Sequence, residues 1–179
     1  SPAPSISAAS GRRGWSRGRL ISCDVHGAKL PRMAAEGRRL GVSILETVCA
    51  DAAVEKTAFL GTADRVLADV PCSGLGVIRK KPEIRYKDLT DMAALPALQK
   101  KILENVSRYV KPGGFVVYST CTILERENQA VAREFLQNHP EFRPVPFSLP
   151  GLDAPEGMCT LWPQTHGTDG FFIAKFQRG

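Results

Sequence analysis

Two nearly continuous apolar runs, each closed by a cysteine, restrict most strongly the folds open to this chain. The first is Ala68-Asp69-Val70-Pro71-Cys72, and the second is Val116-Val117-Tyr118-Ser119-Thr120-Cys121. Such runs are typical of strands that are covered on both faces in a parallel sheet. In open α/β sheets, ligands bind at the edge where the strands end. Two thiols brought to that edge from separate strands indicate covalent chemistry on an electrophilic ring.

The rest of the pattern supports an α/β fold. Strands are predicted at residues 20–24, 42–48, 64–70, 115–119 and 171–176, with a possible edge strand at 142–147. Helices are predicted at 29–40, from Pro96 to 110 and at 125–138, with a separate short turn at 89–95. The alternation of strands and helices predicts a parallel sheet wrapped by helices.

Size and composition limit the class of protein. A chain of 179 residues with 43% hydrophobic residues is predicted to form one domain over residues 20–179, preceded by an atypical, poorly ordered or basic segment at 1–19. The net charge of +6 favours a polyanionic partner. Five cysteines without a CxxC pair argue against disulfides and structural zinc, and together with the lack of an apolar stretch of about 20 residues they indicate a cytoplasmic protein without a membrane span.

Cys121 and Cys72 are the candidate catalytic residues. Cys121 ends one strand and precedes a predicted helix, whose positive dipole end would favour a thiolate. Thr122 and Glu125 have the spacing of a capping box for that helix. Cys72 lies between Pro71 and Gly74, in a loop that can approach a flat ligand closely. The alternative for each cysteine is a small buried hydrophobe.

Three aspartates follow or end predicted strands. Asp69 lies three residues before Cys72 and is expected to direct its carboxylate into the same pocket. Asp24 ends the first strand, where dinucleotide-binding folds place an acid against ribose hydroxyls. Asp51 could bind the amine edge of an adenine. The alternative for all three is a carboxylate that caps a loop or helix.

A basic segment follows the Cys72 loop. Its candidate RNA-binding residues are Arg79, Lys80, Lys81, Arg85 and Tyr86. The cations could hold phosphates while Tyr86 stacks on a base. A solvated surface loop is the alternative.

These motifs resemble those of the Sun family of RNA cytosine-5 methyltransferases. The resemblance is carried by the stretch from Asp69 to Ile84, by Ser119-Thr120-Cys121-Thr122, by Glu127-Asn128, and by Asp169-Gly170-Phe171-Phe172-Ile173-Ala174-Lys175. It covers about residues 20–176. It implies a Rossmann-like sheet, S-adenosyl-L-methionine as the cofactor, and RNA, in particular small-subunit ribosomal RNA, as the substrate.

The resemblance also implies residue roles. Cys121 would be the nucleophile that adds to cytosine C6, and Cys72 would assist release of the product. Asp69 would lie between the cofactor and the base, whereas Asp24 and Asp51 would contact the ribose and adenine of the cofactor. This is covalent catalysis on a base that has left its stack.

The N-terminal part of the chain differs from the sequence pattern of the family. Residues 1–14 do not match the strand and the Gly-rich loop that precede the Asp24 strand in the family, so the sheet is expected to lack its first strand. One alternative is therefore an inactive fragment that only binds RNA. DNA cytosine-5 methylation is another alternative and would make Cys72 the nucleophile, but that family has no partner equivalent to Cys121.

Overall fold

The computed structural model describes residues 18–86 and 89–179, except for the side chains of residues 85 and 89–91. It divides into two compact units, residues 1–54 and 55–179. The predicted atypical segment at 1–19 lies almost entirely outside the described residues. Within the described ranges, no helix has the length and apolar character needed to cross a membrane.

The first unit contains two parallel strands and one helix. Strand β1 (Leu20–Asp24) pairs in parallel with β2 (Leu45–Cys49), and the 3-10 turn η1 (Gly27–Lys29) and helix α1 (Leu30–Arg39) connect them. Gly41 follows the helix with φ of +74°, a conformation that suits glycine at a helix end. The predictions for β1 and α1 are confirmed, whereas β2 begins three residues later than predicted because a turn occupies the residues before Leu45.

The second unit is built on a mixed sheet with strand order β3-β4-β9-β5, on which β8 also pairs with β9. Strands β3 (Ala63–Asp69) and β4 (Val110–Thr120) are parallel, and β9 (Phe171–Arg178) is antiparallel to β4. The shorter strands are β5 (Phe142–Pro144), β6 (Phe147–Leu149), β7 (Leu152–Ala154) and β8 (Met158–Leu161). The remaining elements are η2 (Thr57–Phe59), η3 (Leu75–Val77), η4 (Pro82–Tyr86), α2 (Leu89–Ser107), η5 (Glu125–Glu127), α3 (Gln129–Asn138) and α4 (Pro163–His166).

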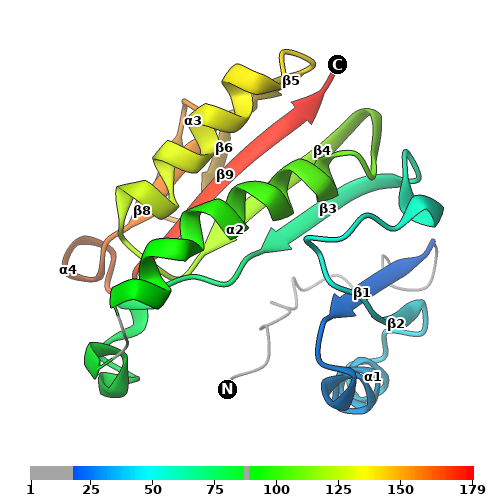
Figure 1. Ribbon diagram of the computed structural model, residues 1–179, viewed down its shortest axis with the longest axis horizontal. Helices are drawn as coiled ribbons and strands as arrows, with labels where there is room; N and C mark the ends of the chain where they lie inside the picture. Colours follow the sequence, from blue (N-terminus) through cyan, green and yellow to red (C-terminus); the bar gives the residue numbers. More distant parts are fainter. Residues whose placement is uncertain (1–17, 87–88) are drawn as a thin grey trace. The chain divides into compact units, whose positions relative to one another are not determined.

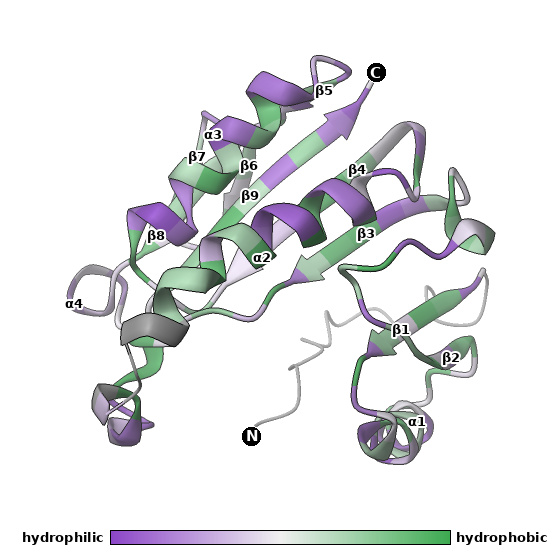
Figure 2. Cartoon of the chain, viewed as in Figure 1, coloured by the Kyte–Doolittle hydropathy of each residue, from purple (hydrophilic) through white to green (hydrophobic). Residues whose placement is uncertain are grey.

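Helices α2 and α3 lie side by side on one face of this sheet (Figure 1). Hydropathy colouring shows polar residues along the outer sides of both helices and apolar residues along β4 and β9 (Figure 2). The buried side chains between the layers come from the helices and from the two central strands. They include Ile102, Leu103, Val106, Val116, Tyr118, Val131, Phe135, Phe172 and Phe176.

Strand β3 is more exposed than its apolar sequence predicts. Leu67 is 69% exposed, and among the described residues β3 pairs only with β4. Strand β1 likewise pairs only with β2 in the described part of the chain. The parallel strands of the described residues therefore belong to two separate sheets.

Two predictions about the helices are wrong. Helix α2 is one continuous element from Leu89, with Pro96 inside it, rather than a short turn followed by a helix that begins at Pro96. Proline removes only one backbone donor there, and burial of residues on both sides, such as Met92 and Ile102, holds the helix together. The third helix is also interrupted: η5 is a separate 3-10 turn, and α3 begins at Gln129.

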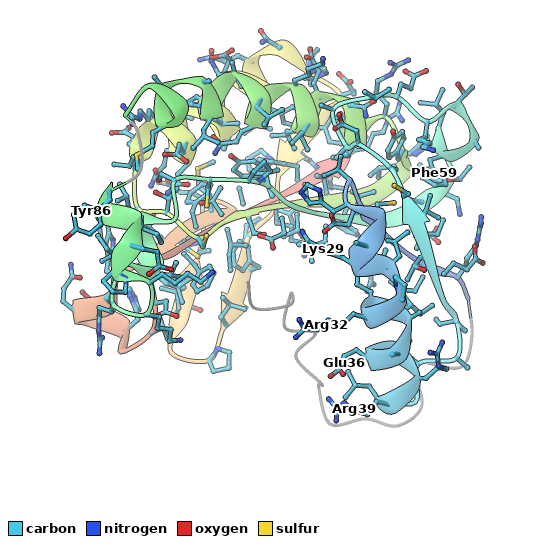
Figure 3. The ribbon with its side chains drawn as sticks, turned by 60° about the horizontal axis from the view of Figure 1, so that its bottom comes forward. Lys29, Arg32, Glu36, Arg39, Phe59 and Tyr86 are labelled. Atoms are coloured by element: carbon cyan, nitrogen blue, oxygen red, sulfur yellow. The ribbon has the colours of Figure 1, made fainter. Side chains whose placement is uncertain are left out.

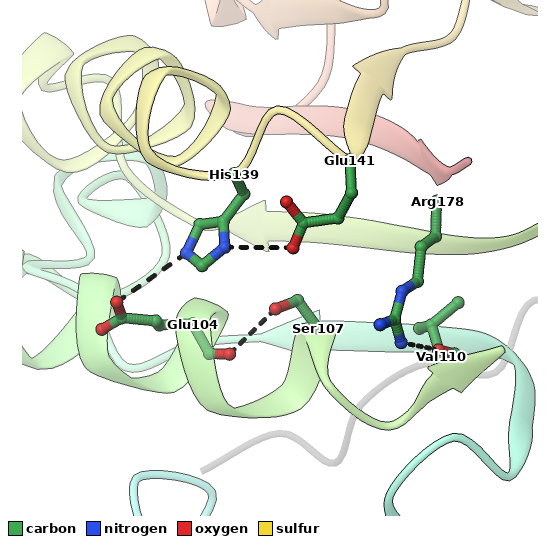
Figure 4. A network of polar contacts seen from close by, with 6 residues as sticks. All are labelled: Glu104, Ser107, Val110, His139, Glu141 and Arg178. Atoms are coloured by element: carbon green, nitrogen blue, oxygen red, sulfur yellow. Dashed lines mark hydrogen bonds and ion pairs between the residues drawn. The ribbon is translucent and has the colours of Figure 1, made fainter. Parts of the chain in front are cut away.

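A polar cluster closes the end of the sheet where β4 begins (Figure 4). His139 Nε2 lies 3.7 Å from Glu104 Oε1, and its Nδ1 lies 3.4 Å from Glu141 Oε1. The imidazole also stacks on Phe135, with ring centroids 4.6 Å apart. Arg178 donates to the Val110 carbonyl at 2.7 Å. These contacts join α2 to the end of α3, and β4 to β9.

Candidate active site

The thiols of Cys72 and Cys121 lie together in the second unit. Their sulfur atoms are 3.0 Å apart, and both side chains are half-buried. The Cys121 backbone N–H also donates to Cys72 Sγ at 3.2 Å. The parallel pairing of β3 with β4, which places Asp69 opposite Ser119, brings the two strand ends into register and so explains the contact. The predicted convergence of the two thiols is therefore confirmed.

The loop that carries Cys72 turns sharply after β3. Val70 N–H donates to the Ser119 carbonyl at 3.1 Å, which keeps the chain against β4 up to Pro71. Gly74 then has φ of +78°, in the left-handed region where glycine carries no steric penalty. Ser73 Oγ is 2.8 Å from Thr122 Oγ1, so the loop is also tied to the residue that follows Cys121.

Close backbone packing fixes the chain around Cys121. Gly76 N–H donates to the Cys121 carbonyl at 3.0 Å, and Gly170 N–H donates to the Gly76 carbonyl at 2.8 Å. A Cβ on Gly76 would lie 1.9 Å from the Gly170 oxygen and 2.9 Å from the Cys121 oxygen. Only glycine lets these three segments meet.

The predicted helix-dipole effect on Cys121 is wrong. The next element is η5, a single 3-10 turn, and the α-helix begins only at Gln129. The predicted capping box is not formed either, because Thr122 Oγ1 bonds Ser73 and the N-cap residue of η5 is Leu124 without a side-chain cap. Packing against the Cys72 loop has displaced the local capping pattern.

The neighbouring Cys121 raises the pKa of Cys72. The hydrogen bond with Cys121 is the largest cause that raises the pKa of Cys72 far above its ordinary value, and burial adds to it. Cys72 therefore keeps its proton and can donate S–H to the Cys121 sulfur. A thiol that donates to a neighbouring sulfur stabilises negative charge on that neighbour.

Asp69 lies at the carboxyl end of β3, as predicted. Ser119 Oγ donates to its Oδ1 at 3.1 Å. Desolvation by the surrounding protein raises the pKa of Asp69, and the Ser119 hydrogen bond opposes this in part. Asp69 and the thiol pair thus lie at the ends of two adjacent parallel strands.

Asp24 and Asp51 lie in the first unit, at and just beyond the ends of β1 and β2. Each carboxylate accepts a backbone N–H two residues further on through Oδ1: Asp24 from His26 and Asp51 from Ala53, both at 2.8 Å. Burial acts to raise the pKa of Asp24, but the hydrogen bonds from His26 and Lys29 outweigh it, so the pKa is lowered. Lys29 Nζ lies 3.0 Å from Asp24 Oδ2, at the start of a row of charged side chains along α1 (Figure 3).

The predicted basic segment ends in the 3-10 turn η4 and is not an irregular loop throughout. Tyr86 is 89% exposed and projects away from the second unit (Figure 3). Arg79 and Lys80 line a shallow polar hollow together with Asp169, and Lys80 Nζ is 2.6 Å from Asp169 Oδ2. Lys81 is half-buried, and the side chain of Arg85 lies outside the described part of the structure.

Two functional candidates were missed by the sequence analysis. Gln99 and Glu127 are fully buried behind the Cys72 loop. Glu127 was named only within a family motif. Gln99 lies in α2 beside the buried apolar residues Ile102 and Leu103, whereas Leu98 is 38% exposed. A polar residue inside an otherwise apolar helix stripe was the available signal.

The fold is of the Rossmann-like class found in S-adenosyl-L-methionine-dependent methyltransferases. The model of the family described as 16S rRNA methyltransferase RsmB/F matches residues 15–177, and the chain belongs to this family. It is 38% identical over 170 residues to the probable ribosomal RNA small subunit methyltransferase B of Bacillus subtilis (strain 168). The match covers 90% of this chain and 38% of that protein.

Solved structures show the same likeness. The crystal structure of PH0851 superposes with a TM-score of 0.84 at 36% identity, covering 90% of this chain and 37% of that one. The structure of NSun6 from Pyrococcus horikoshii with SFG gives a TM-score of 0.72 at 28% identity, covering 90% and 42%. The chain thus spans well under half the length of these relatives.

Proposed function

We propose that this chain catalyses transfer of a methyl group from S-adenosyl-L-methionine to C5 of a cytosine in RNA, through a covalent adduct with Cys121. The single observation that carries the proposal is the Cys72–Cys121 contact of 3.0 Å at the ends of adjacent parallel strands. The names of the relatives support small-subunit ribosomal RNA as the substrate.

The reaction needs a nucleophile because C5 of cytosine is a weak nucleophile by itself. The Cys121 thiolate adds its electron pair to C6, which forms a C–S bond and moves the C5=C6 electron pair to C5. When bound, S-adenosyl-L-methionine supplies the methyl group. Loss of the C5 proton to solvent then restores the double bond, and the C–S bond breaks as Cys121 leaves as a thiolate.

In this mechanism Cys72 donates a hydrogen bond to the Cys121 sulfur both when Cys121 attacks the base and when it leaves. Because its pKa is raised, it remains a thiol that donates a hydrogen bond to Cys121. That bond stabilises the thiolate that attacks and the thiolate that leaves. Asp69, whose pKa is raised by burial, would make the polar contact between base and cofactor that the family resemblance implies.

The residues of this chain fit the proposed cofactor. Asp24 and Asp51 present carboxylate oxygens at the ends of β1 and β2, each held by a backbone amide. Carboxylates in this place suit ribose hydroxyls and an amino group of adenine. Asp24 and Asp51 would hold these two parts, and Lys29 would have to release Asp24 Oδ2 if the ribose binds through that oxygen.

Substitution of each cysteine tests the assignment of roles. With S-adenosyl-L-methionine and an RNA substrate, Cys72→Ala is expected to accumulate a covalent protein–RNA adduct, because release is slowed after the C–S bond has formed. Cys121→Ala is expected to form none. Denaturing gel electrophoresis with labelled RNA measures both. An adduct with Cys121→Ala but none with Cys72→Ala would contradict the proposal and favour the reversed roles.

Binding of RNA without methyl transfer is the second candidate, favoured by the exposed Tyr86 and the hollow beside Arg79. Calorimetric titration of this chain with S-adenosyl-L-methionine distinguishes the two. Heat of binding that is reduced in Asp51→Asn supports the enzyme. Binding of RNA with no heat from the cofactor at high protein concentration would support the binding module.

A further inference from the structure

A buried polar group lies directly behind the Cys72 loop. Glu127 is fully buried, and its Oε2 accepts hydrogen bonds from the Ser73 backbone N–H at 2.8 Å and from Gln99 Nε2 at 3.0 Å. Gln99, also fully buried, donates through the same nitrogen to the Pro71 carbonyl at 2.9 Å. The residues on both sides of Cys72 are therefore bound to one carboxyl–amide pair.

The same pair is fixed to the strand that leads to Cys121. Tyr118 Oη donates to the Glu127 carbonyl at 2.6 Å. The next residue, Asn128, accepts from Thr120 Oγ1 at 2.6 Å and donates to the Thr122 carbonyl at 2.9 Å. Glu127 thus stands between the two cysteine-bearing segments and contacts the surroundings of both.

We propose that Glu127, oriented by Gln99, is a positioning residue that holds the Pro71–Ser73 turn so that the Cys72 sulfur lies against the Cys121 sulfur. Cys72 itself makes no bond to Glu127, which acts through the backbone on both sides of it. Glu127 and Gln99 thereby maintain the hydrogen bond between the Cys72 and Cys121 sulfurs. The significance of this geometry for catalysis rests on the proposed function, whereas the geometry can be tested without it.

The cost of the pair argues against a role in stability alone. Among the described residues, Glu127 Oε1 and Gln99 Oε1 are buried without a hydrogen-bond partner. Buried polar atoms without partners are unfavourable, and an apolar pair of similar volume would avoid that cost. A carboxyl retained there is explained by the position it gives to the turn.

The redox equilibrium of the two thiols measures their relative position without any methyl transfer. In glutathione buffer, one glutathione disulfide accepts two electrons from the pair, so that a Cys72–Cys121 disulfide and two glutathione thiols form. The equilibrium constant rises when the sulfurs are held close together. The experiment uses this chain with Cys23, Cys49 and Cys159 replaced by serine, so that only Cys72 and Cys121 can react.

Three variants of the positioning pair are compared in that background. Glu127→Met fills the space without an acceptor and is expected to lower the equilibrium constant about tenfold, the effect of losing roughly one buried hydrogen bond. Glu127→Gln keeps an acceptor for Ser73 and is expected to stay within about twofold. Gln99→Met removes the donors to Pro71 and Glu127, and it decides the matter if Glu127→Met does not fold.

The matched control is Tyr109→Phe. It removes a buried hydroxyl that accepts from Lys56 N–H and Asn105, at the other end of α2. It is expected to lower the melting temperature but leave the thiol equilibrium unchanged. Equal equilibrium constants in wild type, Glu127→Met and Gln99→Met, or an equal fall in Tyr109→Phe, would overturn the proposal.

A second measurement, the lifetime of the covalent RNA adduct, relates the position of the Cys72 sulfur to the proposed reaction. Glu127→Met is expected to prolong the covalent RNA adduct, as Cys72→Ala does, because Cys72 no longer reaches the leaving sulfur. An altered thiol equilibrium without any adduct in wild type or Cys72→Ala would refute the proposed function and leave the positioning role standing. Normal thiol equilibria together with a trapped adduct in Cys72→Ala would do the opposite.

Discussion

Removal of Cys121 should change the proton affinity of Cys72 more than any other single change in the site. The hydrogen bond between Cys72 and Cys121 is the main cause of the raised pKa of Cys72. Alkylation requires the thiolate, so a raised pKa moves the reaction to higher pH. In Cys121→Ala, the midpoint of the pH profile of Cys72 alkylation is expected to fall, and the rate at pH 8 should rise at least about tenfold.

Mass spectrometry of peptides labelled with iodoacetamide measures this effect. Exposed Cys49 serves as the internal reference in both proteins, since its labelling should not depend on Cys121. An unchanged pH profile for Cys72 after removal of Cys121 would show that burial alone, rather than the neighbouring thiol, keeps Cys72 protonated.

At the level of single residues, sequence reasoning succeeded where a residue ends a strand. Asp24, Asp69 and Cys121 lie at or next to strand ends, because the apolar run that precedes each one defines where the strand stops. It failed for Gln99 and Glu127, which bond to each other across 28 residues of chain and have no local signature. Gln99 and Glu127 are buried because α2 packs on η5, and residue spacing along the sequence does not indicate that contact.

The contact of Gly76 with Gly170 joins three elements, and a small change there should be costly. Gly76→Ala would place a Cβ 1.9 Å from the Gly170 oxygen, so the η3 turn must move away from Cys121. We expect a loss of about 2 kcal/mol or more in unfolding free energy. Denaturant unfolding of the two proteins measures it.

Gly179→Ala is the control for this substitution. The nearest atom to its added Cβ would be the Glu141 oxygen at 3.4 Å, an ordinary contact. Its stability is expected to stay within about 0.5 kcal/mol of wild type. Similar stabilities for Gly76→Ala and Gly179→Ala would mean that the η3 turn is not packed as tightly as the backbone contacts indicate.

Elements defined by periodicity were predicted better than their boundaries. Helix α1 and strands β1 and β9 follow from apolar spacing, and Gly41 marks the end of α1. Helix α2 includes the residues that were predicted to form a separate short turn before Pro96. Burial of its side chains in the tertiary structure outweighed the local preference of proline for a helix start. The capping pattern at Thr122 failed for the same reason, since contact with Ser73 replaced it.

At the scale of the molecule, the excess of six positive charges should govern the affinity for RNA. If Arg79 and Lys81 each contact a phosphate, Arg79→Gln and Lys81→Gln should each reduce the slope of log K against log salt by about 0.7. Lys80→Gln should reduce it less, because Lys80 is already paired with Asp169. The control is Lys101→Gln, which makes the same charge change at an exposed residue of α2, outside this segment.

Fluorescence titration of labelled single-stranded RNA at several salt concentrations provides the slopes. Equal slopes for Arg79→Gln, Lys81→Gln and Lys101→Gln would show that only the overall charge matters and that the segment around Arg79 is not the RNA contact.

The sequence by itself determined the α/β class, the order of the main strands and helices, and the two strand ends that carry thiols. Those features depend on apolar runs and glycines that act locally along the chain. Only the tertiary structure decided how far apart the thiols lie, that the pKa of Cys72 is raised, and that Glu127 and Gln99 bond to the backbone on both sides of Cys72. Distances and proton affinities depend on which residues meet across the fold, and segments nearly fifty residues apart meet only when β3 pairs with β4.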